Sequence, residues 1–128
     1  MALTKIIEID GKEVTFRASA AIPRLYRIRY HRDIMRDLHS LAKAVEEGEI
    51  TGDGSTLDCF SLELFENIAH CMAHHADPKN TPSTPDEWLE QFNVFSIYQI
   101  LPQLLELWGM NLQQDVESKK KLAQLSES

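Results

Sequence analysis

The stretch 23–45 constrains the fold more than any other, because it has the pattern of one long amphipathic helix. At about 100° per residue its apolar side chains gather in one stripe, of the width that a helix buries against a core. These side chains are Ile34, Met35, Leu38, Leu41, Ala42 and Val45. The stretch also carries every arginine of the chain except Arg17. The pattern therefore predicts a long helix with a buried face and a basic face.

The basic face is a row of four residues at helical spacing, with Asp33 beside it. The row consists of Arg29, Arg32, Arg36 and Lys43. Exposed ion pairs on a helix contribute only about 0.3–0.5 kcal/mol each, so a solvated face is one interpretation, and a docking surface for an acidic partner is the other. Arg24 and Arg27 fall towards the apolar side, where they would have to reach solvent or find carboxylates.

Length and composition favour a single soluble domain. The chain has 128 residues, about the commonest size for one domain. No apolar run approaches the length of a membrane span, and the N-terminus lacks the basic-then-apolar pattern of a secretory signal. We therefore expect a cytoplasmic protein. Cys59 and Cys71 are expected to be free thiols, because they lie about 18 Å apart along one predicted helix.

Charge is divided unevenly along the chain, whose net charge is −7. Residues 1–43 carry nine basic and five acidic side chains, a net charge of +4. Residues 44–118 carry one basic and fourteen acidic side chains, a net charge of −13. A molecule with a basic end and an acidic end can associate head to tail, and repeated contacts of this kind build rings or open spirals. We therefore expect a homo-oligomer.

The N-terminal segment predicts a β-hairpin. Residues 4–9 and 12–17 flank Asp10 and Gly11, a pair that supplies the positive φ angles of a type I′ turn. In this register Ile7, Ile9, Val14 and Phe16 share one face. Because a two-stranded ribbon is marginally stable alone, this face is expected to pack on the helices or on another copy.

A second helix is predicted from a cap at Ser55 or Thr56 to about Ala76. Its polar face holds the best candidates for metal ligands, which are Cys59, Glu63, Glu66, His70 and His74. Ligands on one straight helix cannot close round a single ion, and the sequence has no second cluster of His or Cys to help. We therefore expect no bound metal, and a solvated face on which Glu66 pairs with His70.

Two further helices are predicted in the last third of the chain. Thr84, Pro85 and Glu87 fit a capping box with proline at the first helical position, which starts a short third helix. A fourth helix runs from about residue 96 to 108, restarts at Pro102 and is apolar round most of its circumference. The aromatic residues here fill the core or form an exposed interaction surface; they are Trp88, Phe92, Phe95 and Trp108.

The expected fold class is mainly α, with about four helices and an N-terminal β-hairpin. One domain is expected over residues 1–111, followed by a flexible tail over residues 112–128. We expect no enzyme, because no nucleophile, base and orienting group come together from separate segments. We also expect no cofactor, because the glycine-rich string at 52–55 lacks the lysine of a Walker motif.

Nucleic-acid binding is the main rival to protein binding. Many recognition helices that enter a DNA groove are rich in arginine, as is the predicted helix over residues 23–45. Against this interpretation stand the negative net charge and the two acids Asp33 and Asp37 within the basic stripe. We therefore expect no nucleic-acid partner.

Two blocks of the sequence are similar to those of a known family. They are residues 16–38, FRASAAIPRLYRIRYHRDIMRDL, and residues 86–109, DEWLEQFNVFSIYQILPQLLELWG. With LELFENIAHCMAHHADP between them, they resemble the tail assembly chaperones of long-tailed bacteriophages and prophages. The likeness spans about residues 12–110 and assigns no individual binding residue.

The resemblance implies a small, mainly helical protein of the host cytoplasm that is absent from the mature virion. Members of this family bind the very long tape-measure protein, keep it soluble and hold it ready for tail-tube subunits to polymerise around it. They tend to self-associate. A frameshift near the end of the short product commonly appends a second domain that recruits tube protein, and the three lysines at 119–121 could be encoded by a slippery stretch.

Overall fold

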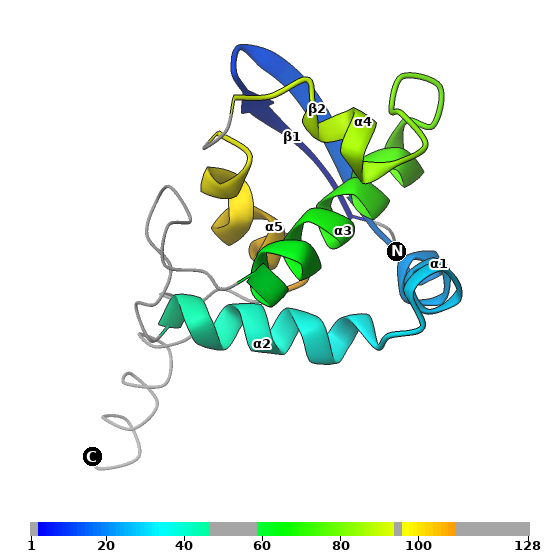
Figure 1. Cartoon of the computed structure of the whole chain (residues 1–128), viewed down its shortest axis with the longest axis vertical. Coiled ribbons are helices and arrows are strands. Elements are labelled where there is room, and N and C mark those ends of the chain that lie inside the picture. The colour runs from blue at the N-terminus through cyan, green and yellow to red at the C-terminus, as the bar shows by residue number, and fades with distance from the viewer. Residues whose placement is uncertain (1–2, 47–58, 94–95, 110–128) are drawn as a thin grey trace, which may run out of the picture.

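The computed structural model describes residues 3–46, 59–93 and 96–109 of the chain. Within these ranges the elements follow the order β1, β2, α1, α2, α3, α4, a short 3-10 helix η1 and α5 (Figure 1). The fold class expected from the sequence, mainly α with an N-terminal β-hairpin, is confirmed. The predicted cap at Ser55 or Thr56, Phe95 and the predicted tail lie outside the described residues.

The hairpin forms as its turn sequence predicts. Strand β1 (Leu3–Ile9) pairs antiparallel with β2 (Lys12–Ala18), so that Ile9 lies opposite Lys12 across a two-residue turn. Asp10 and Gly11 have φ angles of 54° and 77°, the positive values of a type I′ turn. The inner face packs on the helices; Ile7, Ile9 and Phe16 are buried and Val14 is half-buried.

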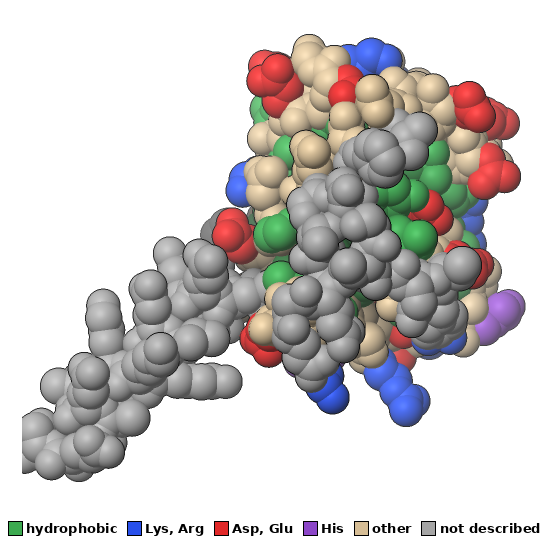
Figure 2. Space-filling model, turned by 60° about the vertical axis from the view of Figure 1, so that its left-hand side comes forward, with side chains coloured by type: hydrophobic (Ala, Val, Ile, Leu, Met, Phe, Trp, Pro, Cys, Tyr) green, Lys and Arg blue, Asp and Glu red, His purple; other side chains and the backbone are tan. Residues whose placement is uncertain are grey.

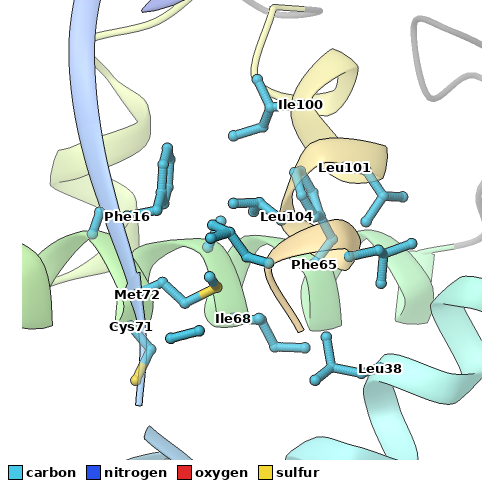
Figure 3. Close-up of a cluster of buried hydrophobic side chains, with 14 of the residues drawn as sticks. Phe16, Leu38, Phe65, Ile68, Cys71, Met72, Ile100, Leu101 and Leu104 are labelled. Carbon is cyan, nitrogen blue, oxygen red and sulfur yellow. The ribbon is translucent and has the colours of Figure 1, made fainter. Parts of the chain in front are cut away.

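Helix α3 (Cys59–Ala76) is the central element and contacts β2, α1, α2 and α4 (Figure 1). Figure 3 shows its side chains Phe65, Ile68 and Met72 between residues from β2, α2 and the C-terminal helix. Its buried residues include Leu64, Phe65, Ile68, Ala69 and Met72. Each large apolar side chain buried in this way contributes about 1.5–3 kcal/mol, so α3 holds the hairpin and the helices in one core.

The prediction of one long helix over residues 23–45 is wrong, because the chain bends after residue 30. Helix α1 (Ala21–Tyr30) ends at His31, which adopts the left-handed conformation with φ 57° and ψ 40°. Helix α2 (Ile34–Glu46) then starts in a new direction. The carboxylate of Asp33 accepts the backbone N–H of Met35 at 3.0 Å, which is the bond of an N-cap residue.

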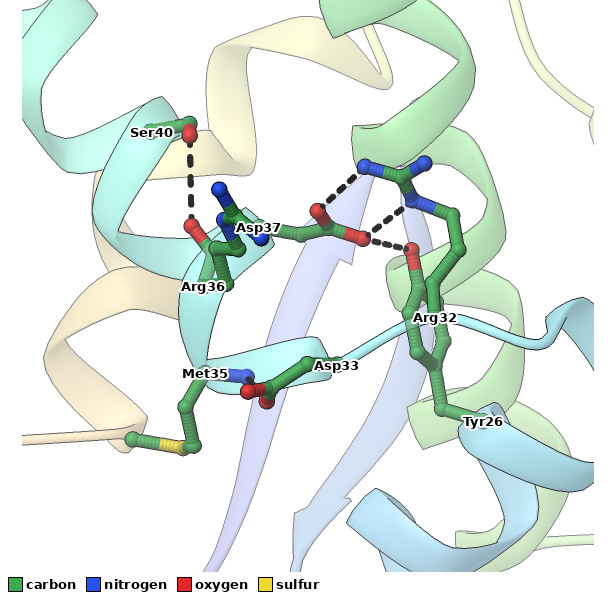
Figure 4. A network of polar contacts seen from close by, with 7 residues as sticks. All are labelled: Tyr26, Arg32, Asp33, Met35, Arg36, Asp37 and Ser40. Atoms are coloured by element: carbon green, nitrogen blue, oxygen red, sulfur yellow. Dashed lines mark hydrogen bonds and ion pairs between the residues drawn. The ribbon is translucent and has the colours of Figure 1, made fainter.

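A polar cluster, the elbow lock of the buried Tyr26 and Asp37 with the half-buried Arg32, fixes this bend (Figure 4). The carboxylate of Asp37 is only 2% exposed and accepts two hydrogen bonds of 2.8 Å from the Arg32 guanidinium. It accepts a third, of 2.7 Å, from the hydroxyl of the buried Tyr26. The expectation that Asp37 and Arg32 belong to one exposed stripe is therefore wrong.

The C-terminal elements are shorter than predicted. Thr84 caps α4 (Pro85–Leu89), since its hydroxyl oxygen accepts the backbone N–H of Glu87 at 3.3 Å, as the capping box predicts. The expected fourth helix is instead the 3-10 turn η1 (Tyr98–Ile100) followed by α5 (Leu101–Leu107), with Pro102 in the first turn of α5. The leucines of α5 are buried at 101, 104, 105 and 107. Helix α5 therefore completes the core.

Replacing Asp37 with asparagine is expected to destabilise the protein by about 2 kcal/mol, because the Arg32 charge loses its buried partner. Urea denaturation at neutral pH measures this difference. The matched control is Asp33→Asn, which removes a carboxylate from the same turn but leaves a good N-cap, so it should change stability by less than about 0.5 kcal/mol. Equal losses from both variants would contradict a special role for the elbow lock.

The same carboxylate makes the elbow lock sensitive to acid. Burial raises the pKa of Asp37, but the hydrogen bonds from Arg32 and Tyr26 outweigh burial and hold this pKa below its ordinary value of 3.8. A carboxylate with a lowered folded-state pKa stabilises the protein above its ordinary pKa and loses this contribution as pH falls through the folded value. The stability difference between wild type and Asp37→Asn should therefore shrink below pH 3.8.

Candidate functional site

The four basic residues predicted as one contact row do not form a continuous row. Arg29 lies on α1 and donates to the backbone oxygen of Ser83 at 3.0 Å. Arg32 belongs to the elbow lock, and Arg36 and Lys43 are exposed on α2 beyond the bend. In Figure 2, Lys and Arg side chains project from the lower edge, where Figure 1 places α2. The bend thus divides the predicted surface.

The predicted aromatic contact residues lie mostly in or against the core. Trp88 is buried and packs edge-on against Phe16, with ring centroids 6.2 Å apart. Phe92 is half-buried against Trp88 at a centroid distance of 5.2 Å. The indole N–H of the half-buried Trp108 donates to the Sδ atom of Met72 at 3.3 Å. A partner can reach only the outer edges of Phe92 and Trp108.

The outward side of α1 has the features of an interaction surface. This α1 face consists of Arg24, Leu25, Arg27 and Ile28, all exposed. Leu25 is 42% exposed and Ile28 is 56% exposed, and their spacing of three residues places them next to each other on the helix surface. Helix α1 contains no acidic residue. The α1 face therefore presents apolar area beside arginines whose charge is uncompensated within the helix.

Sequence reasoning missed the α1 face because it assumed a straight helix. In the register of α2, Arg24 and Arg27 fall on the apolar side. In the structure the buried side of α1 is set by Ile22 and Tyr26 instead, so both arginines point to solvent. The signal that could have shown this is Leu25, which an unbroken helix leaves on its polar side among the basic residues.

A hollow at the bend adjoins the α1 face. This elbow pocket has a volume of about 360 Å³ and is lined by Pro23, Arg27, His31, Arg32, Asp33 and Ile34. Arg27 lines the pocket and also belongs to the α1 face. The only acid in the lining, Asp33, already accepts the backbone N–H of Met35. The lining therefore carries charges of both signs, and Arg32 is engaged with Asp37.

An acidic hollow lies in a different part of the fold. This acidic pocket has a volume of about 440 Å³ and is lined by Asp86, Leu89, Glu90, Phe92, Asn93, Ile97 and Tyr98. The Tyr98 hydroxyl donates to Glu66 at 2.8 Å, and burial raises the pKa of the Glu66 carboxyl. Figure 2 shows Asp and Glu side chains at the upper left and upper right of the molecule, with Lys or Arg between them at the top. The structure thus places basic and acidic surfaces on separate elements.

The predicted metal-ligand face of α3 is solvated only in part: Glu63 is exposed, and Glu66 and His74 are half-buried. His70 is fully buried, and its Nε2 donates to the backbone oxygen of Pro82 at 2.8 Å. Its Nδ1 has no hydrogen-bond partner among the described residues. The predicted pair between Glu66 and His70 is wrong, since Glu66 bonds Tyr98. In the described part of the chain, no three His, Cys, Asp or Glu side chains are placed to hold a metal ion.

Cys71 is buried between α3 and its neighbours as a free thiol. Burial raises its pKa to about 11, so the reactive thiolate is rare at neutral pH. The side chain of Cys59 lies outside the described residues. Cys71 is therefore a core residue and offers no nucleophile.

Comparison with known proteins gives no family for this chain: no family model, no curated protein and no solved structure matches it. Among the described helices, none has the length and apolar character needed to cross a bilayer. The function has to be argued from the surfaces described above.

The burial of His70 predicts a loss of stability in mild acid. Burial lowers the pKa of His70 below 6.5, opposed in part by its bond to Pro82 and reinforced by the positive charges of Arg29 and His74. Below pH 6.5 the unfolded chain therefore binds a proton here before the folded protein does. The free energy of unfolding should fall as pH drops from 6.5 towards the lower folded-state value.

The variant His70→Gln isolates this effect, because glutamine keeps an N–H donor for Pro82 but does not titrate. Urea denaturation at neutral pH and at about pH 5.5 should show a smaller acid-induced loss in His70→Gln than in wild type. His75, whose pKa burial also lowers, is present in both proteins and cancels in the comparison. An identical pH dependence of the two proteins would show that the burial of His70 is not linked to stability.

Proposed function

We propose that this protein is a non-catalytic tail assembly chaperone of a long-tailed phage or prophage. It acts in the host cytoplasm, is absent from the mature virion, binds and solubilises the tape-measure protein, and promotes assembly of the tail tube around it. The observation that carries the proposal is the α1 face, which exposes Leu25 and Ile28 between arginines. The resemblance of residues 16–38 and 86–109 to this family supports the choice of client.

A protein that holds a client soluble needs accessible apolar area rather than reactive groups. Covering the exposed halves of Leu25 and Ile28 contributes only about 1 kcal/mol for each side chain. A single contact of this kind is weak. On a very long helical client, many copies bound side by side reach a useful total affinity through repetition.

Self-association follows from the separation of charge in the fold. The α1 face carries Arg24 and Arg27 on a helix with no acidic residue, whereas the acidic pocket carries Asp86 and Glu90. A contact between unlike surfaces is heterologous and can repeat along a client. A frameshifted longer form would recruit the tail-tube protein; the lysines at 119–121, where a slippery sequence would lie, are outside the described residues.

Co-expression tests the proposed function directly. The chain is expressed with the very long, helix-rich open reading frame encoded nearest to its gene, and the soluble fraction of that client is measured. Wild type should raise this fraction at least severalfold and co-purify with the client. The variant Ile28→Glu should abolish most of the effect, because it places a charge in the apolar part of the α1 face.

The matched control is Ile6→Glu on β1, since Ile6 is 60% exposed and lies away from α1. It should solubilise the client as well as wild type does. If wild type neither co-purifies with the long client nor changes its solubility, the chaperone proposal fails.

Nucleic-acid binding stays the second candidate, and one observation favours it: α1 has exposed arginines and no acidic residue. The continuous basic helix on which the sequence argument depended is divided at the elbow, and Arg32 is engaged with Asp37. A mobility shift with duplex and single-stranded DNA at low salt decides between the two functions. Strong binding that falls steeply with salt would replace the chaperone proposal.

A further inference from the structure

The apolar residues of the α1 face have the spacing of a helix-docking stripe. Ala21, Leu25 and Ile28 are four and three positions apart and lie on the exposed side of α1. By the helical period, Arg24 and Arg27 flank this stripe on one side and Arg29 on the other. The ten residues of α1 rise about 15 Å, which matches two to three turns of a partner helix.

Charge indicates which kind of helix fits. Neither Arg24 nor Arg27 forms an ion pair with a carboxylate of the described residues. Arg29 donates to the backbone oxygen of Ser83, and its guanidinium carbon lies 5.4 Å from the centroid of the Tyr30 ring. Neither contact involves a carboxylate, so neither neutralises the charge of Arg29. A partner with carboxylates beside its own apolar stripe would match this arrangement.

The elbow pocket supplies a second point of recognition. Arg27 lines it together with His31, Arg32 and the acid Asp33. The Arg32 guanidinium already pairs with Asp37, so Arg27 is the guanidinium that a partner would meet there. An aspartate or glutamate side chain from a partner helix lying along α1 could enter it and accept hydrogen bonds from Arg27. The apolar stripe and the pocket together require a partner that is both amphipathic and acidic.

The alternatives fit these observations less well. A nucleic-acid backbone would use the arginines but leave Leu25 and Ile28 against polar phosphates. An anionic membrane would accept both kinds of side chain, but the other side of α1 is packed on α3, so few apolar residues could enter the lipid. A protein helix covers the apolar stripe and pairs with the arginines at the same time.

We propose that the α1 face and the elbow pocket form the docking surface for an acidic amphipathic helix of a partner protein. The inference rests on the proposed function, since this helix is then the repeated element of the client that the chaperone holds. The partner helix lies along α1, places apolar side chains against Leu25 and Ile28, and directs carboxylates to the flanking arginines.

A pair of synthetic peptides tests this inference. Both have about 20 residues, with leucine at the i, i+3, i+4 and i+7 positions of each repeat; one carries glutamate on its flanks and the other lysine. Binding to the full chain is measured by fluorescence anisotropy. The glutamate peptide should bind at least ten times more tightly than the lysine peptide, and raised salt should weaken its binding.

Variants locate the binding. Ile28→Glu, and separately the double charge reversal Arg24→Glu with Arg27→Glu, should each raise the Kd of the glutamate peptide at least tenfold. These residues are exposed and lie outside the elbow lock, so far-UV circular dichroism should be unchanged. The exposed β1 variant Ile6→Glu should bind like wild type.

Three results would overturn the inference: equal binding of the two peptides, binding that the α1 variants leave unchanged, or binding to phosphatidylserine vesicles with none to the glutamate peptide.

Failure of the docking inference can be distinguished from failure of the proposed chaperone function. If the glutamate peptide binds at α1 but the long client stays insoluble, the docking surface stands and the chaperone role falls. If the client is solubilised equally by wild type and Ile28→Glu, the docking inference falls.

Discussion

The buried carboxylate of Asp37 is the constraint on which the rest of the structure depends. A carboxylate removed from water has to be paired, and here it receives two bonds from Arg32 and one from Tyr26. Arg32 can reach it only because the chain leaves the helix at His31. The interaction therefore sets the angle between α1 and α2, and with it the side of α1 that faces solvent.

Two further hydrogen bonds connect helices α1 and α3 to the loop before α4. His70 on α3 and Arg29 on α1 donate to consecutive backbone oxygens, those of Pro82 and Ser83. The loop that leads into α4 is thus held by side chains from two helices. Trp88 of α4 then packs against the ring of His70 and against β2. These contacts join α1 and α3 to the loop before α4, and α4 to α3 and β2.

The small apolar area of the α1 face suits repeated, weak contacts. Leu25 and Ile28 can each contribute only about 1 kcal/mol, whereas the uncompensated arginines select the partner by charge. The acidic pocket, built from α4 and η1 with the residues that flank them, carries the opposite charge. The proposed chaperone function and the proposed docking of acidic helices therefore depend on surfaces of unlike charge and on the number of copies bound.

The sequence by itself determined the elements whose signals are local: the type I′ hairpin at Asp10 and Gly11, the cap at Thr84 and the restart at Pro102. These depend on the backbone preferences of a few neighbouring residues. Only the tertiary structure decided the elbow, the burial of His70 and the exposure of Arg24 and Arg27. The apolar period is disturbed before the bend, where Arg24 and Arg27 fall on the apolar side of an unbroken helix, but this disturbance does not show where the chain turns or which side of α1 is buried. The bend is stabilised because Tyr26 and Asp37 are buried against other elements. The spacing of residues along the chain does not show which elements will cover them.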